Sequence, residues 1–561
     1  MVKKFFNILS REISGLHEAA YLLGAFAILS QVLALLRDRL LAYTFGAGAT
    51  LDLYYAAFRI PDFLFVIVAS FFSASIIIPF FSEKVRISKD HGREFLSAMF
   101  SVFLMAIVAA SAVAFFLAPY LVPKLFPSFA EEPYRSQIIT LTRILLLSPI
   151  FLGLSNLFAS VTQFYNRFFI YGVSPLLYNL GIIFGVVWLV PRFGVIGLVW
   201  GVVLGALMHF LVQAPFVLHQ KLMPKLVFSL KKYRTVLSVM VVALPRMLAL
   251  SAQEVSEFFL VSVASFMSLG SISVFTLSWN LQSVPLSIIG VSYSLAAFPT
   301  LSALFAAGER GKFVELLETT ARYIIFFSLP LVALFAVLRA HIVRIILGSG
   351  AFSWQDTRLT AAALAFFVIS LAAQGLILLF TRARYAAGNT KKPFYINISS
   401  ALVTVISAAI LSKTVVMCPD FRIFIENLFR VEDVPGTSVL MLPLAFSIGS
   451  IFGALIHIYT FNRDYGGVSK SLGRVTFESS LVAFAMGLVS YITLNIASNY
   501  FTLDTFLGVF SQGVIAGLSG VMCGIILLAL LGNRELKEVA VALHKKIRKI
   551  PVIGPDAAGE I

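Results

Sequence analysis

Charged residues are scarce in this sequence. Of its 561 residues, 12% are charged and 59% are hydrophobic, whereas about 25% of the residues of an average soluble domain are charged. So few charges cannot cover a water-facing surface. Apolar runs of about 20 residues, each long enough to cross the hydrocarbon core of a bilayer, recur from end to end. The short alternating segments of a membrane barrel are missing, so the sequence predicts an all-α polytopic membrane protein.

Motifs for catalysis and metal binding are also missing. The two cysteines, Cys418 and Cys523, form neither a disulfide framework nor a metal-ligand spacing. The glycine-containing segment 308–312 is too short for a Walker A loop and is not followed by Ser or Thr. No predicted connection is long enough to hold a soluble catalytic domain. We therefore expect a carrier with no catalytic residues, metal or cofactor, driven by a gradient or by the membrane potential.

Fourteen membrane-spanning helices are predicted from the apolar runs. Several of these runs exceed the length that one crossing needs, so tilted or kinked helices are expected. The predicted spans are 20–44, 53–81, 95–122, 136–162, 170–191, 194–219, 235–264, 270–302, 320–347, 359–381, 393–412, 438–462, 475–496 and 506–531.

Lys and Arg gather in alternate connections and at both ends of the chain. The ratio between the two sets of connections is roughly four to one, which places the basic set and both termini in the cytoplasm. This topology requires an even number of spans, and it accounts for the net charge of +16 without nucleic acid. Residues 1–19 are predicted to lead into the first span. The basic tail, 534–561, is predicted to form an amphipathic helix that binds anionic lipid at the membrane surface.

A weak internal repeat divides the spans. Gly46 and Pro61 are separated like Gly270 and Pro285, and both pairs open long apolar spans. Two related halves with a site between them are typical of transporters. The predicted organisation is an N-lobe at 20–219, a cytoplasmic linker at 220–234, a C-lobe at 235–462 with an outer loop at 413–437, and an extra helix pair at 475–531.

A short set of polar residues falls at membrane depth, mainly in spans 1, 2, 7 and 8. Charges there are costly and by default mark a functional pathway. Arginines suggest an anionic ligand, because a guanidinium binds phosphate oxygens in a fixed fork. Structural ion pairs are the alternative. The candidates are Arg37, Arg39, Asp52, Arg59, Arg246 and Asn280 as binding residues, with Glu254 and Glu257, on one helix face, as a coupling or ion pair.

Four segments carry a resemblance to a known family. Residues Leu36–Pro61, Leu244–Arg246, Asn280–Pro285 and Ala297–Ser302 resemble the MurJ/MviN lipid II flippases, and the similarity extends over nearly the whole chain. The resemblance implies a two-lobed MATE-like fold that moves an undecaprenyl-diphosphate-linked peptidoglycan precursor to the outer leaflet by alternating access. It also implies a bacterial inner-membrane location, a cationic cavity for the diphosphate, and a lipid-tail groove formed by 475–531. We expect a functional monomer.

The chain departs from the family at three cationic positions. Gln31, Phe65 and Asn280 stand where the family commonly has arginines, and we hypothesise that Arg39, Arg59 and Arg246 replace the lost charge. These departures keep two alternatives open. One is a flippase for another polyprenyl-linked glycan or a MATE-like small-molecule exporter. The other is a protein that does not transport, such as a membrane scaffold or a polytopic enzyme.

Overall fold

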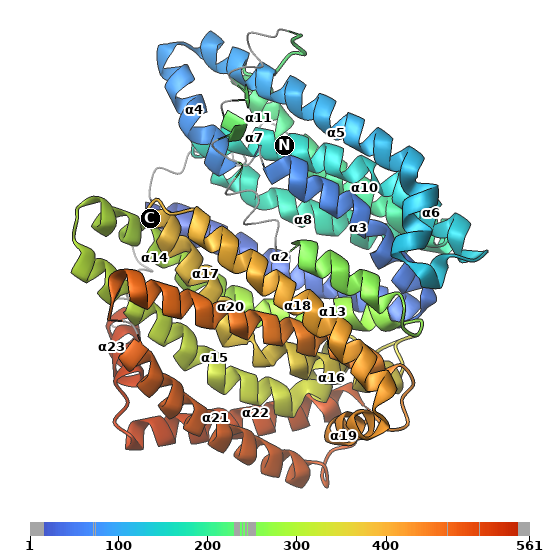
Figure 1. Ribbon diagram of the computed structural model, residues 1–561, viewed down its shortest axis with the longest axis vertical. Coiled ribbons are helices and arrows are strands. Elements are labelled where there is room, and N and C mark those ends of the chain that lie inside the picture. The colour runs from blue at the N-terminus through green and yellow to red at the C-terminus, as the bar shows by residue number, and fades with distance from the viewer. Residues whose placement is uncertain are drawn as a thin grey trace, which may run out of the picture. The chain divides into compact units, whose positions relative to one another are not determined.

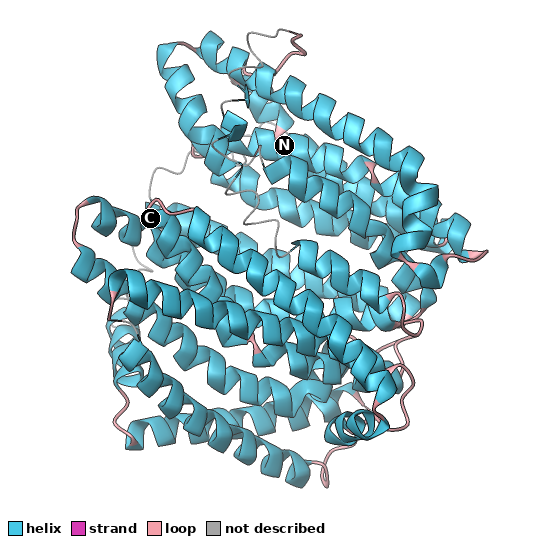
Figure 2. Cartoon of the chain, viewed as in Figure 1, coloured by secondary structure: helices cyan, strands magenta, loops and turns pink. Residues whose placement is uncertain are grey.

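The described part of the chain is helical throughout. The computed structural model describes residues 16–70, 72, 74–228, 236–237, 239–241, 244, 254–467, 469–503 and 505–547. Within these ranges every regular element is a helix, and no strand occurs (Figure 1, Figure 2). The predicted all-α fold class is therefore confirmed.

The first half of the chain supplies most of the helices that surround the candidate site. They are α2 (Leu16–Phe45), α3 (Ala49–Ser70), α4 (Ala74–Ile87), α5 (Lys89–Leu125), η1 (Pro127–Phe129), α6 (Tyr134–Leu145), α7 (Leu147–Phe164), α8 (Phe168–Phe184), η2 (Gly185–Leu189), α9 (Val190–Phe193), α10 (Val195–Leu211) and α11 (Ala214–His219). Residues 254–264 are also helical.

The second half continues the same architecture. Its elements are α13 (Ser271–Leu286), η3 (Ser287–Val291), α14 (Ser292–Ala306), α15 (Arg310–Ile346), α16 (Trp354–Ile369), α17 (Leu371–Ala386), α18 (Lys391–Met417), α19 (Pro419–Phe429), η4 (Thr437–Leu440), α20 (Met441–Tyr465), α21 (Ser469–Ala497), α22 (Phe506–Leu530) and α23 (Arg534–Ile547).

Ten helical segments of the described chain are long and apolar enough to cross a membrane. An eleventh is the bent pair α16 and α17, which meet at 44°. These segments coincide with eleven of the fourteen predicted spans. The remaining three are the predicted spans 20–44, 53–81 and 235–264, which carry most of the charges expected at membrane depth. The multi-pass membrane protein is confirmed, whereas the count of fourteen and the orientation of the termini stay predictions.

The chain divides into two compact units. One comprises 1–284, 346–367 and 388–453, and the other comprises 285–345, 368–387 and 454–561. This division does not test the predicted lobes, which stay a prediction. The first unit contains the whole candidate site, and the second contains α21 and α22, which form the predicted extra helix pair.

Glycines in the first unit allow α8 and α10 to pack backbone to backbone. A Cβ atom added to Gly201 would lie 2.5 Å from the Cα atom of Gly185, and one added to Gly181 would lie 2.3 Å from the Cα atom of Gly205. Small residues at such spacing let membrane helices approach closely. This contact fixes α8, which presents Tyr178 to the candidate site.

The turn between α2 and α3 is built on glycine. Gly46 has a φ of 63°, and a Cβ atom added there would lie 2.7 Å from the carbonyl oxygen of Ala351. Only glycine adopts this conformation without strain. Further along α3, Pro61 interrupts the helical hydrogen bonds, because proline has no N–H to donate. The turn and the proline bracket the stretch of α3 that carries Tyr54, Tyr55 and Arg59.

The last helix, α23, binds α15 within the second unit. The Tyr323 hydroxyl donates a hydrogen bond of 2.5 Å to Oε2 of Glu538, and Nη1 of Arg322 lies 3.7 Å from Oε1 of Glu535. Leu536 packs against the buried apolar cluster of this unit. A helix is therefore present over 534–547, and residues 548–561 of the predicted tail lie outside the described residues. Its first turns contact protein, and binding of its basic face to anionic lipid stays a prediction.

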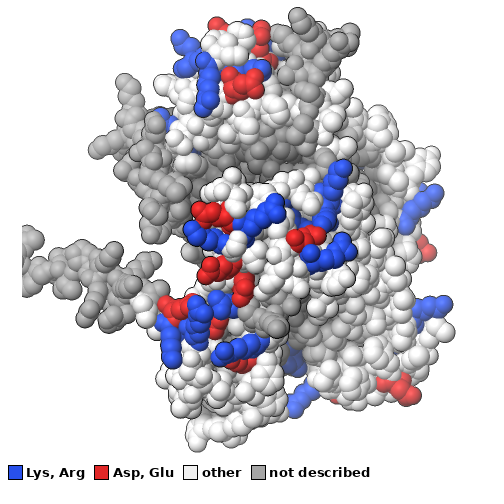
Figure 3. All heavy atoms as spheres, turned by 60° about the vertical axis from the view of Figure 1, so that its left-hand side comes forward, with Lys and Arg blue, Asp and Glu red and all other residues white. Residues whose placement is uncertain are grey.

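One described face of the surface is largely uncharged (Figure 3). On the face drawn in Figure 3, the Lys, Arg, Asp and Glu side chains gather in clusters and leave wide areas of other residues. Large apolar side chains are highly exposed on several helices, including Phe116 at 73% and Phe484 at 72%. Exposed apolar patches of this extent mark surfaces that contact lipid or partners.

Candidate functional site

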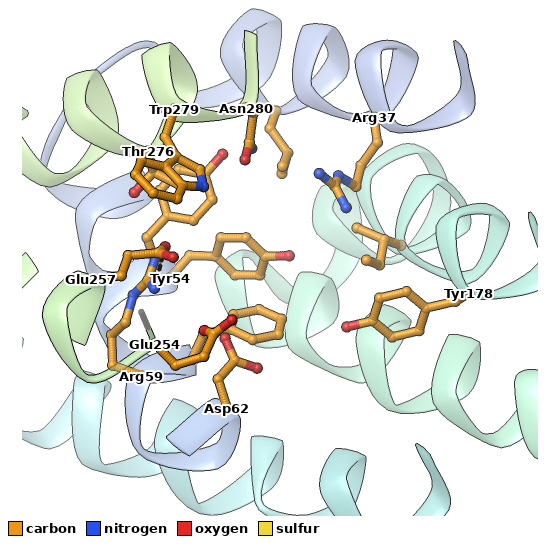
Figure 4. Close-up of a pocket in the computed structure, with 14 residues that line it drawn as sticks. Arg37, Tyr54, Arg59, Asp62, Tyr178, Glu254, Glu257, Thr276, Trp279 and Asn280 are labelled. Carbon is orange, nitrogen blue, oxygen red and sulfur yellow. Dashed lines mark hydrogen bonds and ion pairs between the residues drawn. The ribbon is translucent and has the colours of Figure 1, made fainter. Parts of the chain in front are cut away.

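A polar pocket of about 240 Å³ lies within the first unit (Figure 4). It is smaller than the roughly 300–1,000 Å³ of typical ligand pockets, so it encloses one group of a large ligand. The side chains come from α2, α3, α8, the helical residues 254–264 and α13. Its polar and aromatic lining consists of Arg37, Tyr54, Tyr55, Phe58, Arg59, Asp62, Tyr178, Glu254, Glu257, Thr276, Trp279 and Asn280.

One side of the pocket is organised around Arg37. Its Nε and Nη2 atoms donate to Oδ1 of Asp38 at 2.9 and 2.8 Å, and its Nη1 atom donates to Oδ1 of Asn179 at 3.1 Å. Asp38 is 2% exposed and accepts a further hydrogen bond of 3.0 Å from Nδ2 of Asn280. Buried charges must be paired and hydrogen-bonded to be tolerated. Arg37 is thus held in place with its positive charge matched by Asp38.

The other side is organised around Arg59. Its Nη1 atom lies 2.7 Å from Oε1 of Glu257, and the two side chains are only 10% and 14% exposed. Arg59 also interacts electrostatically with Asp62 and Glu254. Arg59 and Asp62 are three residues apart on α3, as are Glu254 and Glu257 on the facing helix, so each pair lies on one helix face. Figure 4 shows these four residues together, across the pocket from Arg37 and Tyr178.

Carboxylates outnumber guanidiniums among the described residues of this site. Two guanidiniums, Arg37 and Arg59, stand with four carboxylates, those of Asp38, Asp62, Glu254 and Glu257. With all six groups ionised, the described charges leave a net of two negative charges. The family resemblance led us to expect a cationic cavity. The described residues instead form a cavity that holds charges of both signs, with carboxylates in excess.

Aromatic rings and unpaired hydroxyl groups complete the wall. Trp279 packs edge-on against Phe446 and Phe367, with ring centroids 4.7 and 5.4 Å away. The Tyr55 hydroxyl and Oγ1 of Thr276 are buried in the lining and have no hydrogen-bond partner among the described residues. A buried polar group normally has a partner, so these atoms are suited to bind a ligand or water.

The structure brings five of the eight predicted site residues into this pocket: Arg37, Arg59, Glu254, Glu257 and Asn280. Arg39 is not among the lining residues, and its Nη1 atom donates to the carbonyl oxygen of Ile346 at 3.2 Å. Arg246 lies outside the described residues. The other two positions that depart from the family, Gln31 and Phe65, also lie outside the lining.

Asp52 stands apart from the pocket lining and caps a helix. Its carboxylate accepts hydrogen bonds from the backbone N–H groups of Gly270 and Ser273 at 2.6 and 2.7 Å, and from the Ser273 hydroxyl at 2.5 Å. These donors belong to the N-terminus of α13, where the helix dipole favours a negative charge. The buried Asp52 therefore fixes α13, and through it the positions of Thr276, Trp279 and Asn280.

Several lining residues were not predicted. Asp62 follows Pro61 and lies one helical turn after Arg59, so its charge at membrane depth was a usable signal. The aromatic residues Tyr54, Tyr55, Tyr178 and Trp279 had no such signal, because aromatic side chains are common throughout apolar helices. Only the packing of α2, α3, α8 and α13 around one space distinguishes them.

Comparison with solved structures shows that the described helices have a MATE-like fold. The chain is similar to a solved structure titled lipid II flippase MurJ, inward closed conformation, with a TM-score of 0.73 and 23% identity over 91% of this chain and 99% of that one. It is also similar to an inward-facing multidrug resistance MATE transporter of the MOP superfamily, with a TM-score of 0.60 and 17% identity over 78% and 96% of the two chains.

The family follows from the sequence comparison. The chain belongs to the MurJ family of lipid II flippases, because the family model described as lipid II flippase MurJ matches residues 41–511. A probable lipid II flippase MurJ of Thermotoga maritima is 28% identical over 469 residues, or 79% of this chain and 94% of the relative. A lipid II flippase MurJ of Burkholderia cenocepacia is 25% identical over 490 residues, or 86% and 90%. The resemblance seen in the sequence is confirmed, and the family is one of transporters.

Proposed function

We propose that this chain moves lipid II, the undecaprenyl-diphosphate-linked peptidoglycan precursor, from the inner to the outer leaflet of the bacterial cytoplasmic membrane. The observation that carries the proposal is the family match over residues 41–511. This range includes every described lining residue of the pocket except Arg37. Alternating access is the mechanism, with both termini in the cytoplasm and a monomer as the working unit.

The diphosphate is assigned to the Arg37 side of the pocket. Arg37 is held by Asp38 and Asn179, and a guanidinium that is fixed in advance loses little entropy when it binds an anion. Asn280 stands where the family commonly has an arginine, and it donates to Asp38 instead. The Arg37 side therefore has one cation fewer than is common in the family. We assign Arg59 as the second group that binds the anion.

A growth assay tests the proposal in a strain whose own lipid II flippase can be depleted. The chain is expected to restore growth and cell shape, and Arg37→Ala at the same membrane level is expected not to. Lys312→Ala is the matched control, since Lys312 is an exposed cation on α15, outside the pocket, that pairs with the neighbouring Glu309. Failure of the unaltered chain at a normal membrane level contradicts the proposed function. Full growth with Arg37→Ala contradicts the site assignment.

A second candidate is export of a small organic cation, or movement of another polyprenyl-linked glycan. The observation that favours cation export is the excess of carboxylates, with Asp62 and Glu254 both accessible from the pocket. Carboxylates and aromatic rings together suit an organic cation. Energy-dependent efflux of ethidium by the chain, together with no rescue of the depleted strain, would favour this candidate over the flippase.

A further inference from the structure

The short helix α19 follows directly on the membrane-spanning helix α18. Only Cys418 separates the two helices, and its extended backbone, with a φ of −117° and a ψ of 90°, turns the chain between them. Figure 1 shows α18 from the side and α19 almost end-on beside the end of α18. The two helix axes therefore cross steeply. Because α18 spans the membrane, α19 runs close to the membrane plane at the membrane surface.

One face of α19 is fixed by the protein. Ile425 and Glu426 are 5% and 7% exposed. Oε1 of Glu426 accepts a hydrogen bond from the hydroxyl of Thr437, at the start of η4. The ring of Phe429 packs against that of Phe366 on α16, with the two centroids 4.7 Å apart. These contacts join α19 to α16 and to the segment that leads into α20, so the other faces of α19 have a fixed direction.

The exposed side of α19 has an apolar and a polar face. Phe424 and Leu428 are four residues apart, hence on one helix face, and they are 61% and 56% exposed. Asp420 and Asn427 are seven residues apart and share a different face, which Ile423 borders. A helix that exposes an apolar face beside a polar one is typical of helices that lie in the interface between membrane and water.

Exposed apolar side chains continue from α19 onto α18. Val416 and Met417, in the last turn of α18, are 77% and 67% exposed. Leu402, Ile406 and Ile410 are 56%, 55% and 59% exposed and follow one another at intervals of four residues, hence along one face. A stripe of this kind on a membrane span faces lipid hydrocarbon. The lipid-facing surface of α18 thus reaches the junction with α19.

Lys413 marks the level of the lipid head groups. It is exposed and lies about one helical turn before Met417 on α18. A lysine near the end of a span lays its alkyl chain along the apolar surface and extends its ammonium group to the interface. The head groups therefore lie at the height where α18 ends and α19 begins.

We propose that α19 is an interfacial helix that binds the lipid leaflet at the C-terminal end of α18. Phe424 and Leu428 enter the outermost part of the acyl chains beside Val416 and Met417, and the polar face of α19 stays in water. The occupant is bilayer lipid rather than a second protein, because the apolar face adjoins the lipid-facing stripe of α18 and runs along the membrane plane. Since α19 is joined to α16 and to the start of α20, the lipid contact also sets the depth of these helices in the bilayer.

Spin-label depth measurements on the purified full chain in phosphatidylcholine bilayers test this placement. Cys418 and Cys523 are replaced by serine, and a single label is attached in Phe424→Cys, Leu428→Cys or Asn427→Cys. Collisions are measured with oxygen, which concentrates in hydrocarbon, and with a nickel chelate, which stays in water. The labels at 424 and 428 are expected to favour oxygen and to lie about 5–10 Å below the phosphates. The label at 427 is expected to favour the nickel chelate.

Two reference positions calibrate the measurement. Glu432→Cys reports on an exposed residue just after α19, and Phe484→Cys reports on α21, where Phe484 is 72% exposed on an apolar span. Variants are compared once their helical circular dichroism matches that of the unaltered chain, and positions 424 and 428 give independent readings. Labels at both positions that collide with nickel as often as the label at 432 would place this face in water and overturn the inference. Labels shielded from both reagents would show that protein covers the face, which overturns it as well.

Discussion

The ion pair between Arg59 and Glu257 gives the sharpest prediction about stability. Removing the cation with Arg59→Gln leaves Glu257, Asp62 and Glu254 without a shared counter-charge, whereas Glu257→Gln leaves Arg59 beside Asp62 and Glu254. The two substitutions delete opposite halves of one 2.7 Å contact. Even so, we expect them to differ in cost, because only one of them strands carboxylates.

The expected loss in the free energy of unfolding follows from how deeply the Arg59–Glu257 ion pair is buried. Its side chains are 10% and 14% exposed, and removing one partner of a buried ion pair costs about 3–5 kcal/mol. We assign about that cost to Arg59→Gln. For Glu257→Gln we expect about 1–2 kcal/mol, because the amide oxygen still accepts a hydrogen bond from Arg59. The double variant should cost less than Arg59→Gln alone, since it leaves one fewer unpaired carboxylate.

The assay is unfolding of the purified protein in mixed micelles titrated with SDS, followed by loss of helical circular dichroism. All four members of the cycle are compared at one pH near neutrality. Equal costs for the two single variants, or a double variant whose cost is the sum of both, would refute the reasoning that Arg59 is shared by three carboxylates.

Three other contacts give separate predictions. Asp52→Ala removes three hydrogen bonds from the start of α13, and we expect a loss of about 2–4 kcal/mol in the same SDS titration, with Asp52→Asn intermediate. Gly201→Val forces a side chain against Gly185, so the variant should lower both the unfolding midpoint and rescue of the depleted strain. The hydrogen bond from Tyr323 lowers the pKa of Glu538. That bond therefore stabilises α23 at neutral pH and is lost as the pH falls through the lowered pKa, so hydrogen exchange over 534–547 should rise in acid. Glu538→Gln should raise it at neutral pH, and unchanged exchange in both cases would contradict the contact.

Much of the fold and part of the site could be predicted from the sequence. Apolar runs fix helices, because lipid offers the backbone no other partner. Arg37 and Arg59 lie about 200 residues before Glu254 and Glu257 along the chain, and all four meet in one pocket. The single signal that selected them was charge at membrane depth, where a charged side chain is tolerated only with a partner or a water-filled space.

Pairing and capping could not be predicted, because both depend on which helices touch. Asp52 carries the same signal as Arg59, yet it serves the N-terminus of α13 rather than the pocket. Nothing in the spacing of Asp52 and Gly270 reveals that the Asp52 carboxylate reaches the backbone N–H of Gly270. Asp62 also carries a charge at membrane depth, although it was not among the predicted site residues. Tyr178 carries no charge, so nothing in the sequence selects it.

The measurement that tests the central claim most directly is the leaflet-resolved accessibility of lipid II in cells depleted of their own flippase. An externally added enzyme that cleaves only outer-leaflet lipid II reports how much has crossed. With this chain expressed, the cleaved fraction is expected to return to the level of undepleted cells, and with Arg37→Ala it should stay at the depleted level. A cleaved fraction that stays at the depleted level although the unaltered chain is abundant in the membrane would contradict the account.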